Sequence, residues 1–182
     1  MRPASARRLL HASSALVLVL YFFGSPDLLR NVLMGCAALA VILDVIRLRM
    51  PAFAAFITGL VPVFRATEST KLSGATWLSV GYALASWFPH PAMTAGILAC
   101  AFADPAASWA GSKLCRSSLK KTWVGSGVAL AVAAVVISSV VMSWNATVAG
   151  AAAAMALERW SRPLNDNLVI APGTALVVWL IL

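Results

Sequence analysis

Apolar residues occur in long runs along this chain, and short polar segments separate the runs. Within a run the residues are almost continuously apolar, and the longer runs approach the ~20 residues that an α-helix needs to cross a bilayer. We therefore predict one helix for each run. The approximate ranges are Leu9–Phe23, Leu28–Ile46, Ala75–Phe88, Ala92–Ala110, Gly127–Trp144, Ala146–Leu157 and Leu168–Leu182.

An eighth run, Pro51–Phe64, has fourteen residues and carries Pro62 near its end. Such a run is too short for a span and is typical of a re-entrant or interfacial helix. The predicted fold is all-α, a polytopic integral membrane helix bundle of about seven transmembrane helices plus this short one. No linker divides it, so residues 1–182 are expected to form one domain.

The charges in the polar segments predict an orientation. If the N-terminus is cytoplasmic and Pro51–Phe64 does not cross, Arg30 is the only Lys or Arg outside, as the positive-inside rule requires. Five of the six acidic residues then lie on or near the cytoplasmic side, and Asp27 lies outside. We expect a cell (inner) membrane protein whose cytoplasmic segments are Met1–Arg8, Arg47–Ser73, Gly111–Ser126 and Glu158–Asn167.

The first run also has the layout of a signal peptide, because arginines precede it. His11 lies at its edge and no clean small-x-small site follows it, so an uncleaved first helix is the better interpretation.

Composition supports the membrane interpretation, since 61% of residues are hydrophobic and 11% are charged, whereas a soluble domain has about 25% charged residues. The net charge of +8 lies in short loops, which favours anionic lipid headgroups over nucleic acid as partners. Three cysteines without CxxC spacing indicate neither a disulfide framework nor a zinc site.

The segment from Asp104 to Gly127, DPAASWAGSKLCRSSLKKTWVGSG, is the most polar interruption. Asp104 stands near membrane depth, where an ionisable group is expensive and indicates function, with an ion pair as the alternative. The basic residues of this segment fit either a phosphate clamp or a headgroup anchor. They are Lys113, Arg116, Lys120 and Lys121.

Thr122, Gly125, Ser126 and Gly127 favour the phosphate interpretation, because they open the next helix and are expected to offer unpaired N–H groups to an anion. Neither a Walker loop nor a GxGxxG motif occurs, so P-loop and Rossmann sites are disfavoured.

Glu158, Asp166 and Asn167 flank one short loop and provide hard oxygen ligands suited to Mg²⁺. The alternative is structural: Asp166 or Asn167 caps the last helix, and Glu158 pairs with Arg162.

Glu68, Lys71 and His11 are further site candidates. Glu68 and Lys71 bring an acid and a base to the same membrane face, whereas His11 is more typical of an interfacial polar residue. Asp44 and Arg47, three apart on one helix, are expected to neutralise each other.

Over nearly its full length the chain resembles the CTP-dependent lipid-alcohol kinases, the superfamily of dolichol kinase, phytol kinase and the CTP-using diacylglycerol kinase. The resemblance rests on RRLLH, DVIR, ESTKLSGATW, the DPAAS…GSK…KKTWVGS block and the late E…DNLVIAP. Ala103, Cys115 and Val124 depart from the family's pattern.

The resemblance implies CTP as phosphoryl donor, with Asp104, Lys113, Lys120, Lys121 and Gly125 at the nucleotide site. We therefore expect transfer to a membrane lipid alcohol, such as a polyprenol, phytol or diacylglycerol, with Mg²⁺ held by Asp104 and by Asp166 or Glu158. One of these three carboxylates is expected to orient or deprotonate the alcohol. The alternatives are a phosphatidate cytidylyltransferase and, in another class, a small transporter or membrane scaffold.

Overall fold

The computed structural model describes residues 3–60, 68–114 and 121–182, and in these ranges the regular structure is entirely helical. The all-α expectation is therefore confirmed for the described chain. The helices are α1 (Pro3–Ser13), the 3-10 turn η1 (Ser14–Leu18), α2 (Val19–Phe23), α3 (Pro26–Arg49), α4 (Pro51–Leu60), α5 (Gly74–Ala85), α6 (Ala92–Leu114), α7 (Trp123–Ser138), α8 (Trp144–Trp160) and α9 (Asp166–Ile181).

Short polar side chains begin many of these helices by accepting a hydrogen bond from the first turn. The caps are Ser25 for α3, Ser73 for α5, Thr122 for α7, Ser143 for α8 and Asn165 for α9. The predicted end of the Gly127–Trp144 run was wrong because of such a cap. Trp144 was expected in the preceding run, but α7 ends at Ser138 and Ser143 starts α8.

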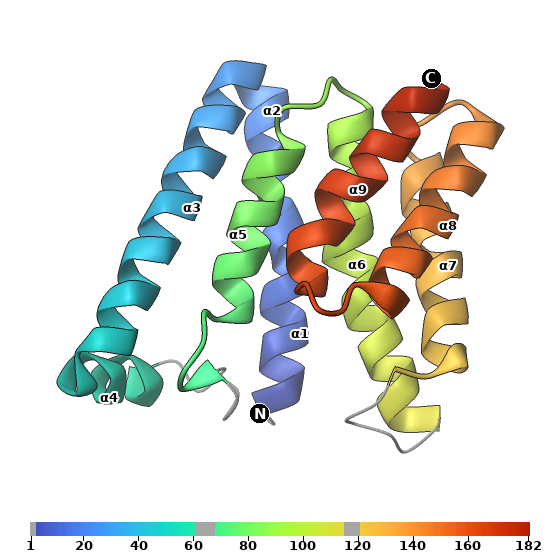
Figure 1. Cartoon of the computed structure of the whole chain (residues 1–182). Coiled ribbons are helices and arrows are strands. Elements are labelled where there is room, and N and C mark those ends of the chain that lie inside the picture. The colour runs from blue at the N-terminus through green and yellow to red at the C-terminus, as the bar shows by residue number, and fades with distance from the viewer. Residues whose placement is uncertain (1–2, 61–67, 115–120) are drawn as a thin grey trace.

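Figure 1 shows the helices side by side, with the chain reversing direction from α1–α2 to α3 and again through α5, α6, α7, α8 and α9. α4 lies across the end of α3 instead, and none of its residues is buried. The described residues of Pro51–Phe64 thus form a short helix apart from the bundle, and residues 61–64 lie outside the described part. The N- and C-termini lie at opposite ends of the bundle.

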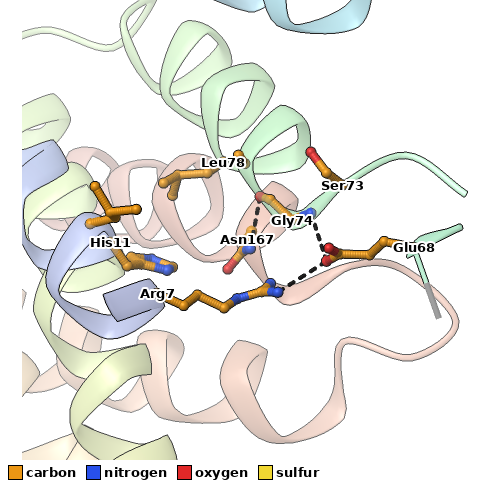
Figure 2. Close-up of a pocket in the computed structure, with 9 residues that line it drawn as sticks. Arg7, His11, Glu68, Ser73, Gly74, Leu78 and Asn167 are labelled. Atoms are coloured by element: carbon orange, nitrogen blue, oxygen red, sulfur yellow. Dashed lines mark hydrogen bonds and ion pairs between the residues drawn. The ribbon is translucent and has the colours of Figure 1, made fainter. Parts of the chain in front are cut away.

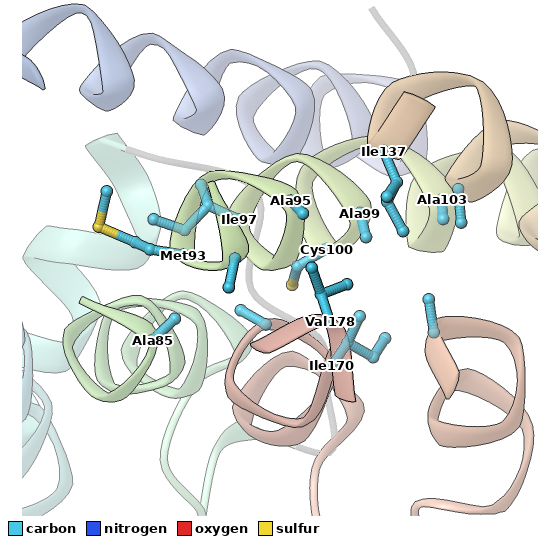
Figure 3. Packing of buried hydrophobic residues seen from close by; sticks show 14 of the residues in the cluster. Ala85, Met93, Ala95, Ile97, Ala99, Cys100, Ala103, Ile137, Ile170 and Val178 are labelled. Atoms are coloured by element: carbon cyan, nitrogen blue, oxygen red, sulfur yellow. The ribbon is translucent and has the colours of Figure 1, made fainter. Parts of the chain in front are cut away.

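Small residues form the core, in which α6 packs against α7, α8 and α9. Buried alanines recur along α6 every three or four residues, at positions 92, 95, 99, 103, 107 and 110. Figure 3 shows this side of α6 facing Ile170 and Val178 of α9. Small side chains let the helix backbones approach closely, which is how helices associate where lipid surrounds them.

Among the residues that the structure describes, two segments are long and apolar enough to cross a membrane, Ser5–Phe23 and Pro26–Arg49. Other apolar helices, such as Trp123–Ser138 and Asp166–Ile181, are shorter. Large apolar side chains lie on the outer surface, among them Leu16, Ile42 and Val135. Surfaces of that kind are rare on soluble proteins, so they agree with a membrane environment.

Candidate functional site

Lys121 lies between two carboxylates that come from different helices. Its Nζ is 2.9 Å from Asp166 Oδ2 and 3.3 Å from Glu158 Oε1, and it also donates to the backbone carbonyl of Glu158. Lys121 directly precedes the cap of α7, Glu158 lies in the last turn of α8 and Asp166 opens α9. We call Lys121, Glu158 and Asp166 the lysine cluster. It joins the two segments that the sequence singled out for phosphate and Mg²⁺.

The electrostatics of the lysine cluster hold Lys121 in its charged form. Burial alone would lower the pKa of the ammonium group, but the charge and hydrogen bond of Asp166, then Glu158 and Asp104, outweigh burial. The pKa of Lys121 is therefore raised above its usual value. Asp104 is thus near enough to act on the same cation.

Ser126 and Arg159 support Glu158 from the other side. Ser126 Oγ lies 3.4 Å from Glu158 Oε2, and Arg159 Nη1 donates to Ser126 Oγ at 3.2 Å. The guanidinium of Arg159 stacks over Trp123, 3.5 Å from the ring centroid. Arg159 and Trp123 were not predicted as site residues, because residues so far apart in sequence leave no local pattern.

The start of α7 differs from the expectation in one respect. The N–H of Gly125 donates to Thr122 Oγ1 at 3.0 Å, and the N–H of Ser126 donates to the Thr122 carbonyl at 3.0 Å. The prediction that these N–H groups are unpaired was wrong, because α7 begins at Trp123 and Thr122 caps it. A Cβ on Gly125 would lie 2.9 Å from the carbonyl oxygen of Ala107, so close packing also accounts for this glycine.

Asp104 and His11 meet beside the lysine cluster. Asp104 Oδ2 lies 3.8 Å from His11 Nδ1, and the Asp104 side chain is about 20% exposed. His11 is buried, and its Nε2 lies 3.9 Å from the thiol sulfur of Cys100. The sequence had favoured an interfacial position for His11, whereas its imidazole lies inside the bundle between α1 and α6.

A second set of polar residues surrounds a cavity of about 130 Å³ next to His11. Glu68 Oε1 accepts hydrogen bonds from Arg7 Nη1 and from the Gly74 N–H, each 3.1 Å long, and Asn167 Nδ2 donates to the Gly74 carbonyl at 2.9 Å (Figure 2). We call this cavity the loop pocket. It is lined by Arg7, Leu10, His11, Glu68, Ser73, Gly74, Ala75, Leu78 and Asn167.

A buried ion pair on α3 fixes the segment that carries Glu68. Asp44 accepts hydrogen bonds of 2.6 Å from Arg47 Nε, the Ser73 N–H and Thr76 Oγ1. Arg47 donates to the carbonyl oxygens of Glu68 and Lys71, both at 2.8 Å. The expected mutual neutralisation of Asp44 and Arg47 is confirmed, but the pair also anchors the segment from Glu68 to Thr76.

The other candidates lie in different surroundings. Lys113 is exposed in the last turn of α6, the Lys71 side chain is exposed, and Lys120 lies outside the described residues.

Asn165, not Asp166 or Asn167, caps α9. Asn167 therefore belongs to the loop pocket, whereas its neighbour Asp166 belongs to the lysine cluster. Among the described residues, no three His, Cys, Asp or Glu side chains lie close enough to hold a metal ion together.

No family model matches the chain, and comparisons with curated proteins and with solved structures give no match either.

Proposed function

We propose that this protein is a membrane-embedded kinase that transfers the terminal phosphoryl group of CTP to the hydroxyl group of a lipid alcohol. The observation that carries the proposal is the lysine cluster, in which one cation and two carboxylates from distant segments meet at one end of the bundle. Phosphoryl transfer needs such charges, because catalysis of this reaction consists mainly of positioning and electrostatic stabilisation. The choice of CTP rests on the resemblance of the Asp104–Gly127 segment.

The proposal includes the membrane topology. We propose that α1–α2, α3, α5, α6, α7, α8 and α9 are seven crossings of the inner membrane, and that α4 lies at its cytoplasmic surface. The lysine cluster and the loop pocket then lie near the cytoplasmic headgroup plane. A lipid alcohol presents its hydroxyl at that depth while its hydrocarbon stays in the bilayer.

The residues of the lysine cluster fit a divalent cation. Glu158 and Asp166 already converge on a single positive charge, and Mg²⁺ usually takes one or two carboxylates together with substrate phosphates. These two residues would hold the ion, and Asp104 would contribute negative charge nearby. Bound Mg²⁺ would neutralise charge on the phosphate oxygens of the donor.

The chain's own groups would then divide the remaining work. Lys121, once released from the two carboxylates, would bind the phosphates of CTP, together with Lys113 and Lys120. Thr122 and Gly125 hold the start of α7 against α6, and Ser126 supports Glu158, so these residues would position the cluster. One of the carboxylates of Asp104, Glu158 and Asp166 would accept the proton of the alcohol.

The test is transfer of label from γ-labelled CTP to lipid, using purified protein in detergent with Mg²⁺ and a panel of polyprenol, phytol and diacylglycerol. ATP, GTP and UTP serve as competing donors. Lys121→Gln and Asp104→Asn should each lower the rate by at least about 100-fold, the usual cost of one electrostatic group. Arg49→Gln is the control, because it removes an exposed cation at the end of α3.

Other outcomes would replace the proposal. Release of the label as pyrophosphate would indicate a cytidylyltransferase, and absence of nucleotide binding would indicate a transporter or scaffold. Full activity of Lys121→Gln would mean that the lysine cluster takes no part in the reaction.

A further inference from the structure

The loop pocket combines a polar end with an apolar wall. Its polar end is formed by the Arg7–Glu68 ion pair, the Gly74 N–H and the Asn167 amide. Its apolar wall comes from Leu10 of α1 and from Ala75 and Leu78 of α5. Figure 2 shows the side chains of Leu78 and His11 on the opposite side from Glu68. A ligand that matches both parts must be amphiphilic.

The position of the pocket allows access from lipid. α1 packs against α6, and α5 packs against α3 and α9, so the pocket occupies the gap between α1 and α5. Leu10 and Ala75 are exposed at its margin, and most of α1 belongs to Ser5–Phe23, a segment long enough to span a membrane. A hydrocarbon chain could therefore lie along α1 while its polar end enters the pocket.

The charges of the pocket select an uncharged headgroup. Arg7 and Glu68 neutralise each other at 3.1 Å, with 23% and 10% of their side chains exposed. An anionic headgroup would have to displace Glu68 from Arg7, and a cationic one would have to displace Arg7 from Glu68, each leaving a mostly buried charge without its partner. A hydroxyl group can donate to a carboxylate and accept from an amide or guanidinium without breaking the pair.

The size of the pocket points to a small headgroup. Its volume of about 130 Å³ is well below the roughly 300–1,000 Å³ of pockets that enclose drug-sized ligands. That space suffices for the hydroxyl end of a lipid but not for a nucleoside triphosphate.

We infer that the loop pocket binds the hydroxyl end of a membrane lipid alcohol and so forms the acceptor side of the active site. Its role as an acceptor site rests on the proposed function. Two residues link it to the donor side: Asn167 follows Asp166 on α9, and His11 lines the pocket while its Nδ1 faces Asp104. The loop pocket is therefore connected through His11 to Asp104, and through Asn167 to the neighbouring Asp166, two of the carboxylates that are proposed to act on the alcohol.

The binding experiment uses the full chain in nanodiscs with tritiated phytol as the probe and no nucleotide. Leu10→Ala should weaken binding about tenfold, because Leu10 lines the pocket, whereas Leu9→Ala should leave it unchanged. The two residues are adjacent on α1 and similarly exposed, 54% and 58%, so this control is closely matched.

A second variant fills the polar end. A Cβ on Gly74 would meet the guanidinium of Arg7 and lie 3.0 Å from Asn167 Nδ2. Gly74→Ala should therefore push Arg7 out of its place at the polar end and lower phytol binding at least about tenfold. Gly35→Ala is its control, since a Cβ there has no neighbour within 4 Å. Glu68→Gln should shift the preference from phytol toward phytanic acid, because Arg7 then lacks its carboxylate.

The outcomes separate this inference from the proposed function. If phytol binds with the expected pattern of variants but no label passes from CTP, the pocket is a lipid-alcohol site and the kinase proposal fails. If transfer occurs while Leu10→Ala and Gly74→Ala both behave like their controls, the acceptor lies elsewhere. If phytol, a polyprenol and diacylglycerol all fail to bind to the unmodified protein, the inference is also overturned.

Discussion

At the scale of single residues, α3 carries the same ion pair twice in different surroundings. Asp44–Arg47 and Asp27–Arg30 are both Asp–Arg pairs three residues apart, but the Asp44 side chain is 4% exposed and that of Asp27 is 79% exposed. Asp44→Ala leaves Arg47 buried without its carboxylate, so we expect a loss of about 3–5 kcal/mol in unfolding free energy. Asp27→Ala should cost less than about 1 kcal/mol. Denaturation of the two variants in detergent measures both losses in unfolding free energy.

The location of the loss distinguishes this explanation from general destabilisation. Because Asp44 and Arg47 bind the backbone between Glu68 and Ser73, amide hydrogen exchange in Asp44→Ala should accelerate first at Ser73 and Gly74. Uniform acceleration over all helices would contradict an anchoring role. The sequence predicted the pair itself from its spacing, but its partners lie 21 to 32 residues away and could not be found from local pattern.

Lys121 predicts a dependence of stability on pH at the same scale. Its pKa is raised in the folded state, so its contribution is complete below the unfolded value of about 10.4. The contribution is lost as the pH rises from there through the folded pKa, because the folded state holds the proton more tightly. Above about pH 10 the melting temperature should therefore fall more steeply in the unmodified protein than in Lys121→Gln. Lys113→Gln, which removes an exposed lysine, should keep the steep fall, and equal slopes in all three proteins would contradict the ion pairs seen at Lys121.

At the scale of helices, apolar runs predicted the elements because a continuous run of this length has few other ways to satisfy its backbone in lipid. The ends were less predictable, because caps decide them. Thr122 caps α7, which begins at Trp123, four residues before Gly127, and Ser143 separates α7 from α8. The sequence also could not predict which helices contact each other, since an alanine-rich run has the same pattern whichever helix it packs against. Gly96 is an example, because only the structure shows that it faces α9.

Gly96 therefore allows a test of helix packing. A Cβ there would overlap the carbonyl oxygen of Ala171 and lie 3.0 Å from Ala175 Cβ, and backbone cannot yield as a flexible side chain can. Gly96→Ala should destabilise the protein by about 1–3 kcal/mol through overpacking. Gly35→Ala on α3 should be neutral or stabilise by up to about 1 kcal/mol, since alanine is the better helix former. A stable Gly96→Ala variant would mean that α6 and α9 are farther apart than described.

At the scale of the whole molecule, the charge pattern predicted which polar segments share one end of the bundle. The charges favoured one number of crossings, and an odd or even number of crossings between two loops decides whether they share a side. The sequence could not predict that Asp166 belongs to the lysine cluster and Asn167 to the loop pocket. The direction in which each side chain leaves the first turn of α9 depends on the helices around it.

The side of the membrane on which the C-terminus lies tests the number of crossings. If only Ser5–Phe23 and Pro26–Arg49 crossed the membrane, both ends of the chain would lie on the same side. Seven crossings place them on opposite sides, matching the opposite ends that they occupy in Figure 1. Because the arginine-rich N-terminus is expected inside, alkaline phosphatase fused after Leu182 should be active, and a green fluorescent protein fused there should be dark. Fusions after Lys113, at the end of α6, should give the reverse, because the proposed topology places that residue on the cytoplasmic side. A fluorescent fusion after Leu182 would exclude seven crossings and, with them, the proposed course of the bundle through the membrane.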